Sequence, residues 1–171
     1  MSLLVGTFRS LAHFTQSPSE ILVAMNQRML ARSSGGFTTC LVLRADIDGT
    51  LTIANAGHIA PYLAGNELPL DNGLPLGIAA ETSYPESVFQ LSRGEQLTLL
   101  SDGVVEARDK GGVLFGFDRT AAITGQSADQ IAHAAELFGQ EDDITAPVSY
   151  THLDVYKRQL SRQGCLQFLG S

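Results

Sequence analysis

An Asp48-Gly49 dipeptide between two runs rich in apolar and β-branched residues is the feature that most constrains the fold of this chain. Residues 37–45 form the first run, and residues 50–56 form the second, in which apolar residues alternate with small or polar ones. Asp-Gly between such runs is among the strongest short-range signals for a tight β-hairpin. The pattern predicts an antiparallel pair of strands and argues against a purely parallel sheet.

The rest of the chain repeats the same mixture of short strands and helices. Further strands are predicted at residues 61–64, 87–91 and 96–101, with a last one starting at Ile144. Helical spacing of apolar residues predicts helices at 2–14, 18–32, 116–124 and 127–138. The second helix opens with Ser17-Pro18-Ser19-Glu20, which combines a capping box with proline at the first helical position. Hairpins with helices alongside predict an α+β layer fold.

Composition narrows the functional classes. The chain has 171 residues, of which 44% are hydrophobic and 17% charged, as expected for one globular domain. Its net charge of −7 argues against a nucleic-acid surface, which requires a dense basic face. No apolar run reaches the roughly 18–20 residues of a membrane span, so no membrane segment is predicted in this chain. Two cysteines far apart in the sequence suggest neither a disulfide framework nor a metal knuckle, which favours the cytoplasm.

The last part of the chain differs in charge from the rest. Residues 1–146 carry 8 basic and 17 acidic residues, a net of −9, whereas residues 147–171 carry three basic and one acidic residue, a net of +2. The string PVSYTHLDVYKRQ at 147–159 resembles an adapter-derived translation found at the ends of truncated gene models. We therefore expect a domain at residues 1–146 and a non-native tail at 147–171, which should pack poorly; a genuine basic arm is the alternative.

Two groups of acidic residues could carry chemistry. Asp102-Gly103 follows the apolar run at 97–100, so the carboxylate is expected at the end of a buried strand, where it would point into a cleft. Asp142-Asp143 precedes the predicted strand at Ile144, and neighbouring carboxylates are costly unless a cation offsets their charge. Hard divalent cations such as Mg²⁺ and Mn²⁺ prefer such oxygen ligands. A plain turn and a solvated acidic loop are the alternatives.

A third group ends the strand at 50–56. Asn55, Gly57 and His58 lie in the sequence Asn-Ala-Gly-His, where small residues are followed by one histidine. A single histidine does not make a metal site, so this group is either a tight loop with a packed histidine or a loop close to a functional site.

Five motifs in order resemble the second half of the SpoIIE/RsbU-like members of the PPM phosphatases, over about residues 1–145. They are NAGH at 55–58, LPLG at 74–77, TLLSDGVVEA at 98–107, Phe-Gly-Phe at 115–117 and EDDIT at 141–145. The resemblance implies an incomplete antiparallel β-sandwich flanked by helices, in α-β-β-α layers. It also implies that Asp102 and Asp142 are metal ligands, with Gly103, Asp143, Asn55, Gly57 and His58 in or near the site.

The resemblance further implies a protein serine/threonine phosphatase with two Mn²⁺ or Mg²⁺ ions. Such ions activate a water that attacks phosphoserine directly, so no catalytic side chain is expected beyond the metal ligands. The resemblance implies a phosphoserine protein as the substrate, such as an anti-sigma-factor antagonist. The carboxylates of Asp102 and Asp142 should then come within roughly 4–7 Å of each other.

The chain departs from the family pattern at its start. A Gly-Asp segment and an Asp-x-x-Gly-x-Gly loop, which precede the first helix in the family, do not occur here. We expect that the sequence is truncated, and that this chain alone hydrolyses phosphate esters slowly or not at all. A non-catalytic binding fragment of the same fold is the alternative.

A second enzyme class also matches one segment. Asp46-Ile47-Asp48-Gly49-Thr50 resembles the nucleophile motif of haloacid-dehalogenase-type phosphatases, in which Asp46 would attack phosphorus and Asp48 would act as acid and base. Arg44 interrupts the apolar run where a buried parallel strand is expected, and the pattern after Thr50 favours a hairpin. A tight turn at residues 46–50 would exclude this alternative.

Overall fold

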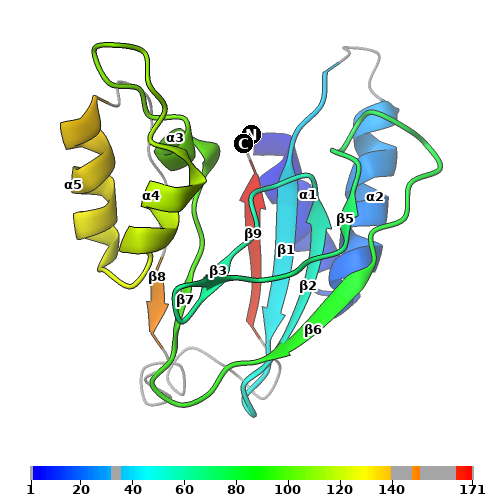
Figure 1. The fold of residues 1–171 in the computed structure, drawn as a ribbon. Coiled ribbons are helices and arrows are strands. Elements are labelled where there is room, and N and C mark those ends of the chain that lie inside the picture. Colours follow the sequence, from blue (N-terminus) through cyan, green and yellow to red (C-terminus); the bar gives the residue numbers. More distant parts are fainter. Residues whose placement is uncertain (1, 32–35, 140–147, 151–164, 171) are drawn as a thin grey trace. The chain divides into compact units, whose positions relative to one another are not determined.

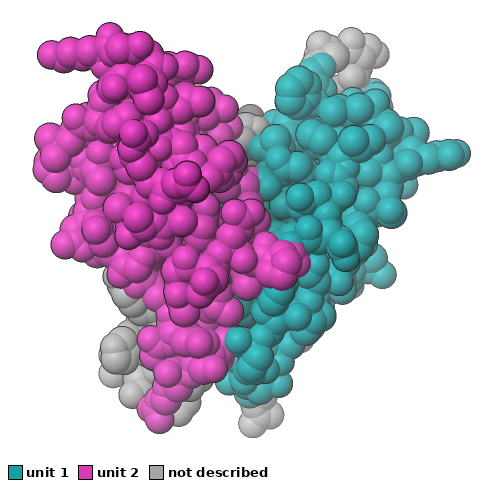
Figure 2. All heavy atoms as spheres, viewed as in Figure 1, with its two compact units in different colours: residues 1–58, 70–90, 153–171 teal, residues 59–69, 91–152 magenta. Residues whose placement is uncertain are grey.

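The computed structural model describes residues 2–31, 36–139, 148–150 and 165–170 of the chain. They divide into two compact units, shown in Figure 2. Unit 1 contains Met1–His58, Leu70–Gln90 and Leu153–Ser171, and unit 2 contains Ile59–Pro69 and Leu91–His152. Both units combine helices with a sheet, so the predicted α+β class is confirmed (Figure 1).

Unit 1 is built on the predicted hairpin. Strands β1 (Cys40–Ala45) and β2 (Thr50–Ala56) pair antiparallel from Cys40 opposite Ala56 to Ala45 opposite Leu51. The sheet order is β5-β2-β1-β9, and β6 also pairs with β2. Strands β6 (Glu86–Gln90) and β9 (Cys165–Gly170) run antiparallel to their neighbours, whereas the two-residue β5 (Asn72–Gly73) pairs parallel with β2.

Helices α1 (Ser2–Leu11) and α2 (Pro18–Leu30) belong to the same unit. The predicted cap of α2 is confirmed, because the Ser17 hydroxyl accepts the Glu20 N–H at 3.2 Å. The Glu86 carboxylate of β6 adds to this cap by accepting from the Ser17 hydroxyl at 2.6 Å and from the Ser19 N–H at 3.1 Å. These bonds fasten the first turn of α2 to the edge of the sheet. Helix α1 ends three residues earlier than the range predicted for it.

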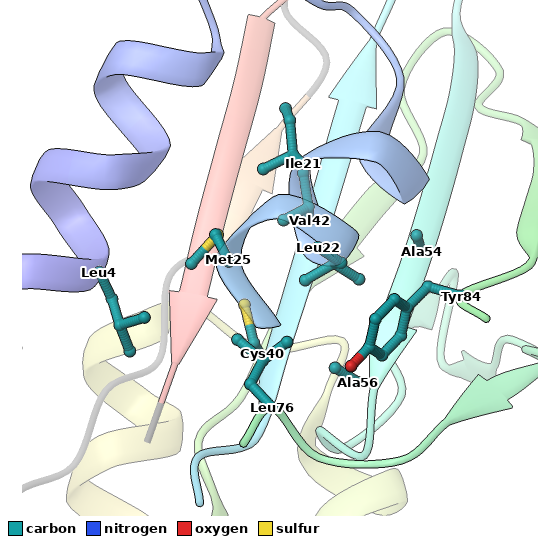
Figure 3. Packing of buried hydrophobic residues seen from close by; sticks show 10 residues of the cluster. All are labelled: Leu4, Ile21, Leu22, Met25, Cys40, Val42, Ala54, Ala56, Leu76 and Tyr84. Atoms are coloured by element: carbon teal, nitrogen blue, oxygen red, sulfur yellow. The ribbon is translucent and has the colours of Figure 1, made fainter. Parts of the chain in front are cut away.

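The core of unit 1 lies between α2 and the face of the sheet formed by alternate residues of β1 and β2 (Figure 3). Leu22 and Met25 of α2 pack there with Cys40 and Val42 of β1, all fully buried, together with Tyr84. Burial, with a smaller contribution from the nearby Cys40, raises the pKa of Tyr84 to about 12. Burial also raises the pKa of the Cys40 thiol far above its usual range, so this cysteine behaves as a small apolar residue.

Unit 2 has a four-stranded antiparallel sheet in the order β4-β3-β7-β8. Its strands are β3 (Tyr62–Leu63), β4 (Asn66–Glu67), β7 (Gln96–Thr98) and β8 (Val148–Tyr150). Three helices accompany them, α3 (Asp102–Val105), α4 (Gly116–Ile123) and α5 (Ala128–Phe138). A second core cluster joins Tyr62 of β3 with Val104 of α3, Phe115, and Ile131 and Ala135 of α5.

The turn between α4 and α5 is fixed to β7 by polar side chains. The Gln96 side chain donates to the carbonyls of Thr124 and Gln126 at 2.9 Å each, and the buried Thr98 hydroxyl donates to the Thr124 carbonyl at 2.8 Å. Ser127 then starts α5 with a complete capping box. These contacts hold the helical pair on the strand that leads to Asp102.

Several predicted boundaries shift. The strand predicted at 96–101 ends at Thr98, and the segment 65–77, for which no strand was predicted, contains β4 and β5. The strand start predicted at Ile144 lies outside the described residues. Within the range expected to be a non-native tail, β8 pairs with β7 and β9 pairs with β1, and the origin of that tail stays a prediction.

Candidate functional site

Asp102 stands at the first position of the short helix α3, in unit 2. The chain reaches it through the buried residues Leu99 and Leu100, and Ser101 is the helix N-cap residue. The main-chain carbonyl of Asp102 accepts the Glu106 N–H at 2.8 Å, which closes the single turn. Burial of Val104 holds this turn against the core, while Asp102 itself is partly exposed. The carboxylate was expected at the end of a buried strand, but β7 ends at Thr98 and Asp102 instead opens a well-packed helical turn four residues later.

Gly103 follows Asp102 within α3 and is also partly exposed. The other acidic pair, Asp142 and Asp143, lies outside the described residues. The predicted approach of Asp102 to Asp142 is therefore untested and stays a prediction.

The last described residue before that pair is Gly139, the C-cap of α5. Its φ is +128°, and its N–H donates to the carbonyls of Ala135 and Glu136 at 3.2 and 3.0 Å. A Cβ atom at this position would lie 2.3 Å from the Arg108 carbonyl oxygen, so only glycine fits. The chain therefore leaves α5 directly beside the segment that follows α3.

Asn55, Gly57 and His58 form a tight turn at the end of β2, in unit 1. The Asn55 side chain is fully buried, accepts the His58 N–H and donates to the His58 carbonyl, both at 2.8 Å. It also donates to the Asn72 side chain of β5 at 2.8 Å. Gly57 has φ of +75°, and a Cβ there would lie 2.8 Å from the Pro75 ring. The three predicted residues come together, and the described contacts of Asn55 shape the loop.

His58 is 7% exposed. The expectation of a packed histidine in a tight loop therefore holds as far as packing is concerned. His58 lies in unit 1 and Asp102 lies in unit 2. That the Asn-Ala-Gly-His turn lies near the site therefore stays a prediction.

Sequence reasoning missed Asn26, which holds the next motif in place. Asn26 lies on α2, is 2% exposed, accepts the Gly77 N–H and donates to the Ala79 carbonyl, both at 2.8 Å. Gly77 has φ of +90°, and a Cβ there would meet the Gly36 carbonyl at 2.7 Å. A polar residue next to Met25 on the apolar stripe of α2 was the available signal.

The residues described here match the predicted metal ions in chemistry but are too few for a complete centre. Asp102 offers a carboxylate oxygen, the donor type that Mg²⁺ and Mn²⁺ prefer. Among the described residues, however, no group of three histidine, cysteine, aspartate or glutamate side chains is close enough to hold a metal ion. The second predicted ligand, Asp142, lies in the part of the chain left undescribed.

The haloacid-dehalogenase alternative does not fit the structure. Residues 46–49 form the tight turn of an antiparallel hairpin, in which the Asp46 N–H donates to the Thr50 carbonyl at 2.9 Å. Asp46 pairs with Arg44 at 3.1 Å rather than following a buried parallel strand. The Thr50 N–H bonds to the Asp48 carboxylate at 2.9 Å and lowers its pKa, which opposes a role as proton donor.

In the part of the chain that the structure describes, no helix is long and apolar enough to cross a membrane.

Several solved structures of bacterial proteins have a similar fold. The RsbU and RsbW domains of Rv1364c from Mycobacterium tuberculosis match with a TM-score of 0.67 and 22% identity, over 86% of this chain and 46% of that one. PppA, described as a key regulatory component of T6SS in Pseudomonas aeruginosa, matches with a TM-score of 0.62 and 20% identity. The match covers 86% of this chain and 76% of PppA. The SiaA-PP2C domain of Pseudomonas aeruginosa matches with a TM-score of 0.64 and 22% identity, and the match covers 86% of this chain and 67% of that one.

This chain thus spans less than half the length of the first of these structures. At such identities the likeness establishes the fold, which is that of the PP2C or PPM phosphatases. No curated protein matches the chain significantly. The sequence model of the family described as Stage II sporulation protein E (SpoIIE) matches residues 1–151, which is most of the chain. The protein therefore belongs to the SpoIIE family and contains a SpoIIE/RsbU-like domain of the PPM phosphatase fold.

Proposed function

We propose that the chain is part of a metal-dependent protein serine/threonine phosphatase in which Asp102 and Asp142 would hold divalent cations. The observation that carries the proposal is the SpoIIE family match over residues 1–151, which includes both acids. The placement of Asp102 at the partly exposed start of α3 supports it, because a ligand must be accessible and still firmly held. Mn²⁺ or Mg²⁺ is the proposed ion type. Two fold neighbours are described as Mn presoaked and as in complex with magnesium.

The side chains of this chain would contribute position rather than covalent chemistry. A bound pair of divalent cations would supply a hydroxide at neutral pH and neutralise the phosphoryl oxygens. Asp102 would be held in place by the burial of Val104 in the same helical turn, and the adjacent Gly103 carries no side chain. Asp143 is proposed as a second carboxylate near Asp142. No side chain of the chain is proposed as a nucleophile.

The proposed substrate is phosphoserine on a regulatory protein, such as an anti-sigma-factor antagonist. The descriptions of three fold neighbours support this substrate class. One contains RsbU and RsbW domains, one is called a regulatory component, and one is called a cell fate determinant. We place the reaction in the cytoplasm because the two cysteines are separated by more than 120 residues and suggest no disulfide framework. We also propose that the domain proper is 1–146 and that 147–171 is a non-native tail.

Turnover by this chain alone is proposed to be slow or absent. Two carboxylates are too few to fix two cations with a water between them, and Mg²⁺ keeps its own waters unless the site is near octahedral. A non-catalytic fragment that binds a partner is the second candidate. It is motivated by the absence from this sequence of the Gly-Asp segment and the Asp-x-x-Gly-x-Gly loop of the family.

Metal binding and turnover separate these candidates. We expect the 171-residue chain to bind Mn²⁺ weakly in titration calorimetry, and Asp102→Asn to reduce that binding. A version extended by the preceding genomic sequence should hydrolyse p-nitrophenyl phosphate and a phosphoserine peptide with Mn²⁺.

In that version, Asp102→Asn and Asp142→Asn should each remove most of the activity. Asp46→Asn is the matched control and should not, because Asp46 is engaged with Arg44 at the hairpin turn. Rapid Mn²⁺-dependent turnover by the 171-residue chain would overturn the assumed ligand set. Absence of metal binding in both versions would favour the non-catalytic candidate.

A further inference from the structure

The chain between α3 and α4 folds back on itself as a small hairpin at residues 108–114 in unit 2. Arg108 and Leu114 form an antiparallel bridge, and the Asp109 N–H donates to the Val113 carbonyl at 3.0 Å. In Figure 1 the hairpin is the green loop that reaches beyond the ends of α3 and α5. It is therefore a projecting element rather than part of either sheet.

The hairpin is braced by its own side chains and by α4. The Asp109 carboxylate accepts the Gly111 and Val113 N–H groups at 2.8 and 2.9 Å. Arg119, in the first turn of α4, donates to the Leu114 carbonyl at 2.8 Å. Because these bonds form within the chain, the hairpin keeps its shape without a bound partner, and its outward side chains stand on a firm frame.

Apolar side chains of the hairpin and of α4 are left partly in water. Val113 is 52% exposed, Leu114 is 41% exposed, and Phe117 near the start of α4 is 57% exposed. Directly opposed residues of an antiparallel pair point to the same side, so the side chains of Leu114 and Arg108 are neighbours. Exposed apolar residues that occur singly need no explanation, whereas several together beside a cation indicate a surface that binds another molecule.

Most cations of unit 2 gather at the same place. The described residues of this unit include eight acidic and four basic side chains, and three of the four basic ones lie on the hairpin or in the first turn of α4. These three are Arg108, Lys110 and Arg119. Within the described residues none of them is ion-paired with a carboxylate. Glu106 and Asp118 are exposed close by in the chain, whereas the Asp109 carboxylate is engaged inside the hairpin. An acidic unit thus carries its positive charge mainly on one projecting element, which favours a negatively charged partner.

The hairpin also adjoins the segment that bears Asp102. It begins six residues after Asp102, directly behind the helical turn that Asp102 opens. Its base packs against the end of α5, where a Cβ at Gly139 would lie 2.3 Å from the Arg108 carbonyl oxygen. A protein bound along the hairpin would therefore contact unit 2 next to a proposed metal ligand.

We propose that the hairpin at 108–114, together with the first turn of α4, is a docking surface for the phosphoprotein substrate. Its occupant is an acidic segment of that protein: Arg108 and Lys110 face the carboxylates, and Leu114 and Phe117 cover an apolar side chain within the segment. This inference rests on the proposed phosphatase function. It assigns to the hairpin the recognition of the protein around the phosphoserine, not of the phosphoryl group itself.

Binding is tested on the 171-residue chain without turnover. The probe is a labelled phosphoserine peptide with glutamates and one leucine beside the phosphoserine, and a second peptide carries glutamines in place of the glutamates. At low salt the acidic peptide should bind about fivefold more tightly, and added salt should reduce that advantage. Lys110→Glu should remove most of it, because Lys110 is exposed and its charge is reversed. Arg93→Glu is the matched control and should preserve it, because Arg93 is the exposed basic residue of unit 2 outside the hairpin.

Equal binding of the two peptides, or an equal loss in both variants, would overturn the docking surface. Absence of binding at millimolar peptide concentration would overturn it as well. Phe117→Gln tests the apolar part and should weaken the leucine peptide more than one with alanine in its place, since Phe117 is exposed. The same effect on both peptides would remove Phe117 from the surface.

The version extended by the preceding genomic sequence separates this inference from the proposed function. Hydrolysis of p-nitrophenyl phosphate by the unmodified extended protein tests the phosphatase alone. In that protein Lys110→Glu should lower kcat/KM for the acidic peptide about fivefold through KM rather than kcat, as expected for lost docking. A loss confined to kcat would contradict docking. If the extended protein hydrolyses neither substrate, the proposed function fails, and the peptide-binding comparison still decides the docking surface.

Discussion

Replacement of Asn55 by alanine tests whether the Asn-Ala-Gly-His turn is held by one buried amide. Asn55 is fully buried and makes three hydrogen bonds of 2.8 Å, two to the main chain of His58 and one to the side chain of Asn72. The bonds to His58 are buried, whereas Asn72 is exposed and can turn to water. The cost should therefore come mainly from the two main-chain groups of His58.

The magnitude follows from those two groups. Loss of the partner of a buried polar group costs roughly 1–3 kcal/mol, so Asn55→Ala should lower the free energy of unfolding by about 3 kcal/mol. This is a large share of the roughly 5–15 kcal/mol that stabilises an ordinary domain. Asn66→Ala is the matched control, because the Asn66 side chain is exposed and donates to the nearby Ala64 carbonyl at 3.2 Å. That change should stay within about 0.5 kcal/mol.

Urea denaturation followed by far-ultraviolet circular dichroism measures the effect, since the chain contains no tryptophan. A loss of about 3 kcal/mol should move the urea midpoint by roughly 1–3 M. Equal midpoints for Asn55→Ala and Asn66→Ala would show that the turn does not depend on this amide.

Asn55→Asp adds a pH signature to the same test. The new carboxyl would face two acceptor oxygens in a buried site, which raises its pKa in the folded state above the usual value of about 3.9. Protonation then favours folding. The variant should be least stable above its folded-state pKa and should recover stability as the pH falls toward about 4. A deficit that does not shrink on acidification would contradict this environment.

Three further outcomes are expected. Asn26→Ala should lower the free energy of unfolding by about 2–4 kcal/mol in urea titration, because the Gly77 N–H and the Ala79 carbonyl lose their partner. Gln27→Ala is the control and should have little effect, because Gln27 is exposed. Gly57→Ala should lower the thermal unfolding midpoint more than Gly94→Ala does. Both glycines have positive φ, but only Gly57 lacks room for a Cβ atom. Similar midpoints for the two variants would contradict this steric explanation. In a Cys165→Ser background, Cys40 should stay unreactive to a thiol reagent at pH 8 until urea unfolds the chain, because burial raises the pKa of its thiol; rapid labelling of the native protein would contradict this.

The sequence predicted best the features that depend on neighbours in the chain. The Asp48-Gly49 turn and the Ser17 cap of α2 are local, so their residue types alone indicate the structure. Boundaries were less certain where an apolar run continues past the end of an element. Leu99 and Leu100 are as buried as a strand would make them, yet the strand has already ended at Thr98. Burial alone does not distinguish paired from unpaired extended chain.

The candidate site was predictable only in part, for a related reason. Asp102 stands out because an acid follows an apolar run, and its accessible position agrees with that signal. The roles of Asn26 and Asn72 depend on partners 51 and 17 residues away in the chain, and no local pattern encodes those contacts. The polar position on α2 showed that some partner was needed, but not that it would be Gly77.

The segment 72–77 has almost no regular structure, yet successive contacts fix it to different elements. Asn72 bonds to Asn55, the Leu76 main chain bonds to Thr38 in both directions, and the Gly77 N–H bonds to Asn26. Such a segment should vary in sequence more easily than in length. A one-residue insertion would shift every later contact at once, whereas the turn at Ala64-Gly65 has open space beside its glycine. Among related chains, insertions and deletions should therefore collect at 64–66 and avoid 72–77, and amide exchange at Leu76 and Gly77 should be as slow as in a strand.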